Sequence, residues 1–151
     1  GDDGALLKYA AYLKKHPNTS DFINYHAGKL YFELGNYDNS YFYLYKLSGR
    51  SSAYRDEALY ALGVIGIEHQ KNAARGSQYL KKLAGDGSAS GEFVQKARLY
   101  LAMMAKEQGN DEAARDYLTD ILGTTRDRLL RIQAMNLLEH FGLWRGDGRT
   151  E

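Results

Sequence analysis

Apolar residues recur along this chain with the three-to-four-residue spacing of amphipathic helices. In the first such stretch, 5–16, they share one face: Leu6, Tyr9, Ala10 and Leu13. The same spacing predicts further helices at 21–34, 38–47, 55–69, 73–84, 92–108, 111–122 and 126–141. No stretch shows the period-two alternation of a β-strand. The pattern therefore predicts an all-α chain of about eight helices.

Residues typical of helix ends stand at the borders of these stretches. Ser20 or Thr19 is a candidate N-cap, and Pro17 follows the first stretch, where it stops a helix. Glycine fits the position just after a helix, as in the turn Gly35-Asn36-Tyr37 and the turn Gly109-Asn110. Short turns of this kind predict antiparallel helix pairs. Gly142 is expected to end the last helix, with Trp144 folding back onto it.

A second spacing, longer than the helical period, recurs three times. A small residue is followed 12 or 13 residues later by another, then by a leucine after four residues and by an aliphatic residue three further on. The three sets are Gly28–Ser40–Leu44–Leu47, Gly63–Gly76–Leu80–Leu83 and Ala102–Ala114–Leu118–Ile121. Glycine inside a helix costs about 0.5–1 kcal/mol relative to alanine, so Gly28 and Gly63 indicate close helix contacts. Repetition of such pairs predicts stacked supersecondary units.

The segment from Ala27 to Tyr37 (AGKLYFELGNY) has the small helix residue, the tyrosine three residues later and the turn glycine of the tetratricopeptide repeat, which it resembles. Leu62-Gly63 and the segment from Gln108 to Ala114 repeat parts of this signature. The resemblance covers about residues 5–122 and implies a right-handed superhelical stack of antiparallel helix pairs. The helix-to-helix periods of 35 and 39 residues are longer than the family's unit, and the second turn has an extra residue and no glycine.

The resemblance implies a single domain over 1–145, with repeats at 21–47, 55–84 and 92–122 and a capping helix at 126–141. Residues 5–17 match only the second helix of a repeat, so this segment is either a cap or the remainder of a cut repeat. Residues 146–151 are expected to form a flexible tail.

In this family the first helix of each pair lines a concave groove. The resemblance therefore assigns partner binding to twelve residues: Phe22, Tyr25, Lys29, Phe32, Glu33, Tyr60, Val64, Ile67, Glu68, Leu99, Met103 and Glu107. Such an apolar, aromatic groove with an acidic edge suits an extended peptide or an amphipathic helix. The alternative is that many of these side chains pack against neighbouring helices instead.

Three tyrosines, Tyr41, Tyr43 and Tyr45, alternate with Phe42 and Leu44 in one predicted helix. Successive residues point about 100° apart, so the five cannot share one face. They serve either contacts between repeats or a second binding surface, for which tyrosine is well suited. Self-association is a further expectation for the predicted groove, since another copy of this chain could supply the helix that binds there.

The composition and the motifs of the chain argue against several classes of function. With 20 basic and 19 acidic residues, the net charge of +1 gives no electrostatic argument for nucleic acid. No apolar run is long enough to span a bilayer, and the absence of cysteine excludes disulfides and thiol chemistry. The four histidines are scattered, and no phosphate-binding loop, nucleophile elbow or zinc-protease motif occurs. We therefore expect no catalytic activity, cofactor or metal.

The sequence thus predicts a protein–protein interaction scaffold that binds a peptide or helix of a partner protein. The link around Ser51 to Tyr60 resembles that of bacterial cell-envelope members of the family, which favours assembly of an envelope complex, in the envelope or periplasm. The alternative is a regulatory or targeting domain of a larger enzyme or secretion complex. The arginines at 126, 128 and 131 are expected to form a solvated face or to contact a phosphate or an acidic partner.

Overall fold

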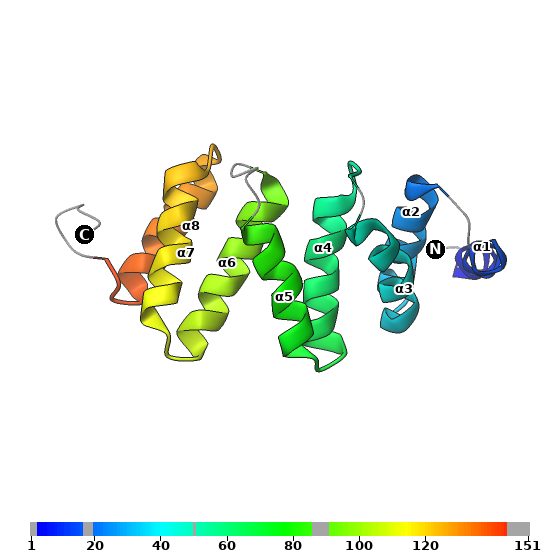
Figure 1. Ribbon diagram of the computed structural model, residues 1–151, viewed down its shortest axis with the longest axis horizontal. Helices are drawn as coiled ribbons and strands as arrows, with labels where there is room; N and C mark the ends of the chain where they lie inside the picture. Colours follow the sequence, from blue (N-terminus) through cyan, green and yellow to red (C-terminus); the bar gives the residue numbers. More distant parts are fainter. Residues whose placement is uncertain (1–2, 17–19, 50, 86–90, 145–151) are drawn as a thin grey trace. The chain divides into compact units, whose positions relative to one another are not determined.

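A computed structural model describes residues 3–16, 20–49, 51–85 and 91–144, and these residues form helices and connecting turns without a strand (Figure 1). The prediction of an all-α chain is confirmed over this range. The helices are α1 (Asp3–Lys15), α2 (Asp21–Glu33), α3 (Tyr37–Ser48), α4 (Arg55–Val64), the π-helix η1 (Ile65–His69), α5 (Ala73–Ala84), α6 (Glu92–Glu107), α7 (Asp111–Thr124) and α8 (Arg128–His140). Pro17, Thr19, residues 86–90 between the second and third predicted pairs, and the 146–151 tail lie outside the described residues.

Helix ends follow the local signals in the sequence. The side chains of Asn36 and Asn110 accept hydrogen bonds from the backbone N–H of the third residue after each, at 3.2 and 3.1 Å. The preceding Gly35 and Gly109 have φ of +72° and +76°, the left-handed conformation that favours glycine. Ser20 occupies the N-cap position of α2, but its side chain makes no capping hydrogen bond.

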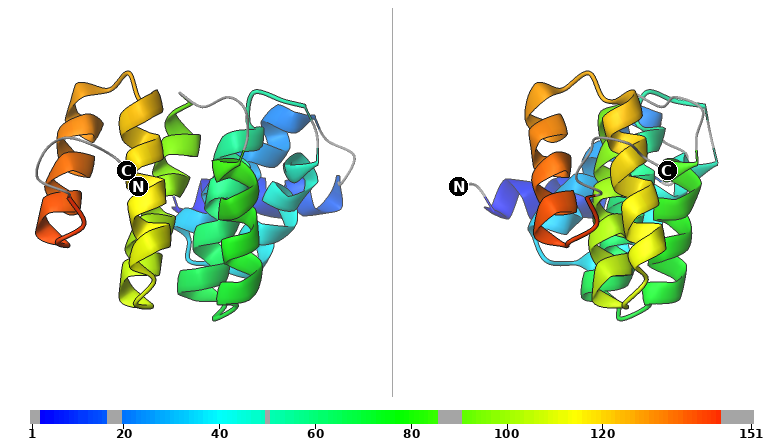
Figure 2. Two further views of the ribbon diagram at one scale, coloured as in Figure 1. Left: turned by 60° about the vertical axis from the view of Figure 1, so that its left-hand side comes forward. Right: turned by 90° about the vertical axis from the view of Figure 1, so that its left-hand side faces the viewer.

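The chain divides into two compact units, unit 1 (Gly1–Tyr79) and unit 2 (Leu80–Glu151), with the boundary inside α5. The single domain over 1–145 stays a prediction. In unit 1, α2 and α3 form a hairpin, with α1 packing on α2 and α4 on α3. In unit 2, α7 packs against both α6 and α8, and the views of Figure 2 show these helices side by side.

The small residues of the first repeat lie at a close helix contact in unit 1. The Ser40 hydroxyl donates to the Gly28 carbonyl at 2.7 Å, and a Cβ at Gly28 would lie 2.5 Å from the side chain of Leu44. The predicted contact between α2 and α3 is thereby confirmed. Leu44 belongs to a buried cluster that also holds Leu47, Ala58, Leu62 and Ile65.

Gly63 and Gly76, the second small-residue pair, are equally close. The predicted helix that contains Gly63, however, ends differently from the prediction. A Cβ at Gly76 would lie 2.5 Å from the Gly63 carbonyl oxygen. The predicted helix 55–69 closes as a π-helix, in which Gln70 N–H donates to the Ile65 carbonyl at 2.9 Å. This wider turn accommodates the extra residue between the two glycines, 13 rather than 12. Lys71, with φ of +50°, takes the conformation that glycine has in the other two turns.

In unit 2, a buried core cluster joins α6, α7 and α8. Ala102 and Ala114, the third small-residue pair, are fully buried in it. From α8 come Ala134 and Leu138, and Leu143 folds back into the same cluster. The backbone N–H groups of Leu143 and Trp144 both donate to the Leu138 carbonyl, at 2.8 and 3.0 Å. The predicted return of Trp144 onto the last helix is confirmed.

Candidate partner-binding site

An open cavity of about 530 Å³ lies in unit 2 between the N-terminal halves of α6 and α8. Three leucines provide its apolar surface: Leu99, Leu129 and Leu130. Polar and charged residues complete the lining: Glu92, Gln95, Lys96, Thr125, Arg126, Asp127 and Gln133. The volume falls within the range of about 300–1,000 Å³ found for ligand sites. Leu129 is 77% exposed, the largest exposure among the described large apolar side chains.

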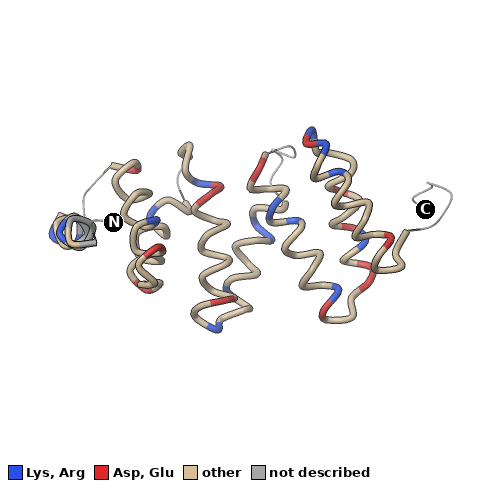
Figure 3. The backbone as a smooth tube through the Cα atoms, turned by 180° about the vertical axis from the view of Figure 1, so that it is seen from behind, with Lys and Arg blue, Asp and Glu red and all other residues tan. Residues whose placement is uncertain are grey.

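Charges at the rim of this cavity are mostly engaged within unit 2. Lys96 pairs with Glu92 one helical turn away, at 3.0 Å. The Asp127 carboxylate caps α8 by accepting from the N–H groups of Leu129 and Leu130, at 2.8 and 3.3 Å. Figure 3 shows the charged positions gathered where the chain enters α8. Arg126 is exposed there and forms no side-chain hydrogen bond or ion pair within the described residues, which leaves a positive charge for a ligand.

The α7–α8 link, which forms one wall of the cavity, is held by polar contacts from α6 and α8. The buried Arg98 donates to the Ala84 carbonyl and, at 3.0 Å, to the Thr124 hydroxyl. Arg131 donates to the Thr125 carbonyl at 3.1 Å. The hydrogen bonds of Arg98 and Arg131 therefore hold in place the link that forms this wall of the cavity. Arg131 thus makes a structural contact in addition to carrying an exposed charge.

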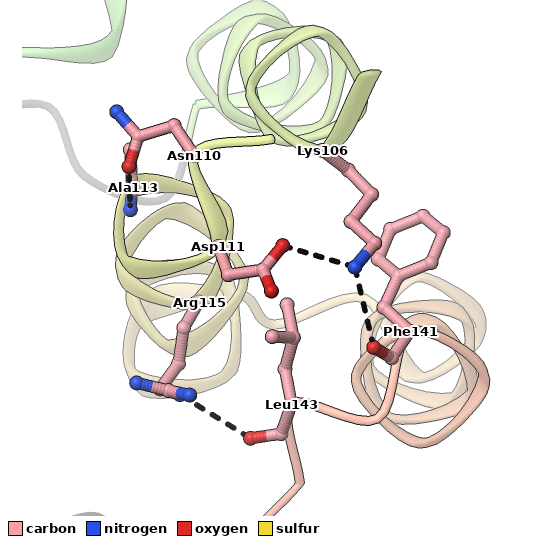
Figure 4. A network of polar contacts seen from close by, with 7 residues as sticks. All are labelled: Lys106, Asn110, Asp111, Ala113, Arg115, Phe141 and Leu143. Atoms are coloured by element: carbon pink, nitrogen blue, oxygen red, sulfur yellow. Dashed lines mark hydrogen bonds and ion pairs between the residues drawn. The ribbon is translucent and has the colours of Figure 1, made fainter. Parts of the chain in front are cut away.

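A second set of contacts fixes the other end of α8 (Figure 4). The Lys106 ammonium contacts the Asp111 carboxylate at 2.9 Å and the Phe141 carbonyl at 3.5 Å. Arg115 donates to the Leu143 carbonyl at 3.3 Å. Because both ends of α8 are tied to the α6–α7 hairpin, the distance between the two helices that line the cavity is defined before any ligand binds.

Of the predicted binding residues in unit 2, only Leu99 lines the cavity. Leu99 is half-buried and also packs against the core cluster. Met103 and Glu107, one and two turns further along α6, are exposed. The three side chains share a face of α6, but the cavity covers only its N-terminal end.

In unit 1, two predicted residues form a network with Glu57 of α4. The Tyr25 hydroxyl donates to the Glu57 carboxylate at 2.6 Å, and Lys29 lies 3.6 Å from the same group. Tyr25 also stacks on Tyr54, with ring centroids 4.4 Å apart. Burial, and then the bond to Glu57, raise the pKa of Tyr25 above its ordinary value. These contacts join α2 to α4.

The other predicted residues of unit 1 are distributed between packing and solvent. Phe32 packs against the core cluster and meets His69 edge-on. Phe22 is 55% exposed on α2, and Glu33 and Glu68 are exposed. Tyr60, Val64 and Ile67 are half-buried. The Ile67 side chain lies beside Gly76, where a Cβ would approach it to 2.7 Å.

The tyrosine-rich helix α3 places its aromatic residues in different surroundings. Tyr43 is 1% exposed, whereas Phe42 and Tyr45 are 51% and 56% exposed. The hydroxyl of Tyr41 is hydrogen-bonded to that of Tyr79 on α5. The expected division into packing residues and surface residues is thus observed, and Phe42 and Tyr45 form an exposed aromatic face.

Sequence reasoning did not select three residues that matter most in the cavity: Leu129, Leu130 and Gln133. They lie in the predicted capping helix, which was not considered as part of the groove. The signal was present, since two leucines follow Asp127 and Arg128 at the start of that helix. Within the described residues there is no cluster of His, Cys, Asp or Glu that could hold a metal ion, and no helix is long and apolar enough to cross a membrane.

Comparison of the chain with protein-family models, curated proteins and solved structures gives no match.

Proposed function

We propose that this chain is a non-catalytic helical-repeat scaffold of tetratricopeptide type, and that it binds a segment of another protein in the cavity between α6 and α8. The observation that carries the proposal is the cavity itself, with three leucines on its walls and Leu129 exposed at its edge. A groove between helices with this lining suits the apolar face of a helix or of an extended peptide.

The repeat assignment is supported by close contacts at the predicted positions. Gly28 meets Ser40, Gly63 meets Gly76, and Ala102 and Ala114 share one buried cluster. Three helix pairs with the same packing device are what a helical-repeat array requires. The right-handed superhelix and a role in assembling an envelope complex belong to the proposal through the family resemblance.

The lining also indicates the chemistry of the bound segment. The leucines would take up apolar side chains, and Arg126 would face an acidic residue of the partner. The exposed Gln133 offers its amide group to a peptide backbone. We therefore propose an amphipathic segment with aliphatic residues on one side and a carboxylate near its end.

Site-specific photo-cross-linking tests this proposal in the native host. A photoreactive residue at Leu129 should capture a partner protein at a defined peptide, whereas the same residue at Phe42, a similarly exposed position on unit 1, should not. Addition of Arg126→Glu should reduce the capture at position 129. Cross-linking from position 42 but not from 129 would place the binding surface on the aromatic face of α3 instead.

A further inference from the structure

Helix α8 has a second exposed apolar face, on the side away from the unit 2 core. Ile132 and Met135 are 44% and 43% exposed, whereas Ala134 and Leu138 on the core-facing side are buried. With Arg128 before and Glu139 after, the spacing along this face is four, three and four residues, as in the seam of a coiled coil. At 100° per residue these four side chains fall within about 60° of one another.

This seam, defined as Arg128, Ile132, Met135 and Glu139, is separate from the cavity, because none of its residues lines it. All four side chains are exposed. Neither Arg128 nor Glu139 makes a side-chain hydrogen bond or ion pair within the part of the chain that the structure describes. The seam therefore has an apolar centre and one unused charge of each sign at its two ends.

The seam is complementary to itself in only one direction. When two copies of α8 run antiparallel, Arg128 of each lies opposite Glu139 of the other, and Ile132 of each lies opposite Met135. A parallel pair would instead place arginine against arginine and glutamate against glutamate. Antiparallel packing also sets the opposite ends of the two helix dipoles beside each other.

We propose that the α8 seam is the interface of a symmetric homodimer in which two copies of α8 pack antiparallel. The contact is isologous, so it closes as a dimer and does not propagate. Because α8 has 13 residues and the seam only four, the interface is small and the dimer is weak and concentration-dependent. The pairing leaves the cavity open and does not depend on the proposed function.

Sedimentation equilibrium on the whole chain, from micromolar to millimolar concentration, tests this pairing. The parent should form a dimer, and Ile132→Glu should stay monomeric with an unchanged melting temperature. Glu139→Arg should raise the dimer Kd by about tenfold, because two ion pairs become two repulsions. Asp116→Arg, an exposed change of the same charge on α7, should leave the Kd unchanged, and the exchange Arg128→Glu with Glu139→Arg should restore it.

Disulfide trapping tests the direction of the pair, and the chain has no cysteine of its own to interfere. Arg128→Cys mixed with Glu139→Cys should give a cross-linked heterodimer. Arg128→Cys alone should not, because the two copies of residue 128 lie about 16 Å apart along an antiparallel pair. A parent that stays monomeric into the millimolar range would overturn the proposal. So would a Glu139→Arg variant that dimerises like the parent, or a cross-link formed by Arg128→Cys alone.

Discussion

At the scale of single residues, the close packing of helices depends on positions where a β-carbon has no room. Gly76 is the tightest of these, because a Cβ there would lie 2.5 Å from the Gly63 carbonyl oxygen and 2.9 Å from the Ile67 nitrogen. Both are backbone atoms, which cannot move aside as a flexible side chain can. The contact therefore requires the absence of any side chain.

We predict that Gly76→Ala destabilises the protein by about 1–3 kcal/mol, as expected for overpacking. Urea unfolding followed by circular dichroism measures the change. The control is Gly123→Ala in α7, where a Cβ would meet nothing within 4 Å. That substitution should be neutral or stabilising by about 0.5–1 kcal/mol. Equal effects of the two would show that the contact at Gly76 is not tight.

Tyr79 gives a prediction about pH. Its burial, and then its hydrogen bond with Tyr41, raise the pKa of the Tyr79 hydroxyl well above the ordinary value of 10.0. Above pH 10 the Tyr79 hydroxyl loses its proton in the unfolded state, while the folded state still retains it. Stability from this group is therefore complete below pH 10 and is lost as the pH rises further.

When the pH is raised from 8 to 11, the free energy of unfolding should therefore fall less for Tyr79→Phe than for the parent. Below pH 10 the variant should be less stable by about 1 kcal/mol, since it lacks the bond to Tyr41. Urea midpoints at the two pH values give both numbers. The same loss in parent and variant on going to pH 11 would refute the role assigned to Tyr79.

The residues that could be predicted from the sequence are those whose surroundings are local and repeated. Gly28 and Ser40 were found from spacing alone, because a helix hairpin imposes the same steric demand on each repeat. The left-handed conformation of Lys71 was not predictable, because a lysine in a sequence does not indicate a positive φ. Leu129 was not either, because its place at a cavity depends on how α8 lies relative to α6, an arrangement of residues distant in the sequence.

At the scale of elements, the turn between α4 and α5 shows how one extra residue is accommodated. The chain closes α4 as a π-helix and reverses through Lys71 with φ of +50°. Asn72 then accepts from the Arg75 N–H at 3.1 Å and begins α5. The insertion is absorbed at the turn, so Gly63 and Gly76 stay in contact.

Replacing Lys71 by glycine should stabilise the protein by about 1 kcal/mol, because a residue with a side chain pays roughly 1–2 kcal/mol to adopt the left-handed conformation. Thermal or urea unfolding measures the gain. As a control, Lys81→Gly at an exposed position within α5 should cost about 1 kcal/mol. A loss of stability for Lys71→Gly would mean that the lysine side chain stabilises the turn in its own right.

At the scale of the whole molecule, the chain is all-helical over the described residues and divides into two compact units. The helix pattern was predictable because amphipathic periodicity is a property of each segment. The division into two units was not predictable, because the small-residue sets occur in every helix pair. They do not indicate which pairs contact one another most. Exposed apolar surfaces occur in both units: the aromatic face of α3 in unit 1, and the α6–α8 cavity and the α8 seam in unit 2.

Binding of a partner segment in the cavity of unit 2 can be measured directly. Peptides selected from a random library on the intact chain provide a probe for both surfaces. Their affinity is then measured by fluorescence anisotropy for the parent, for Leu129→Glu and for Phe42→Glu. Both substitutions place a carboxylate at an exposed apolar position, so they are matched in charge and in their small expected effect on folding.

We predict that Leu129→Glu weakens peptide binding by about tenfold or more, equivalent to roughly 1.4 kcal/mol, whereas Phe42→Glu binds like the parent. Melting curves of both variants should match that of the parent. Loss of binding in Phe42→Glu with full affinity in Leu129→Glu would contradict the claim, and would assign recognition to the aromatic face of α3.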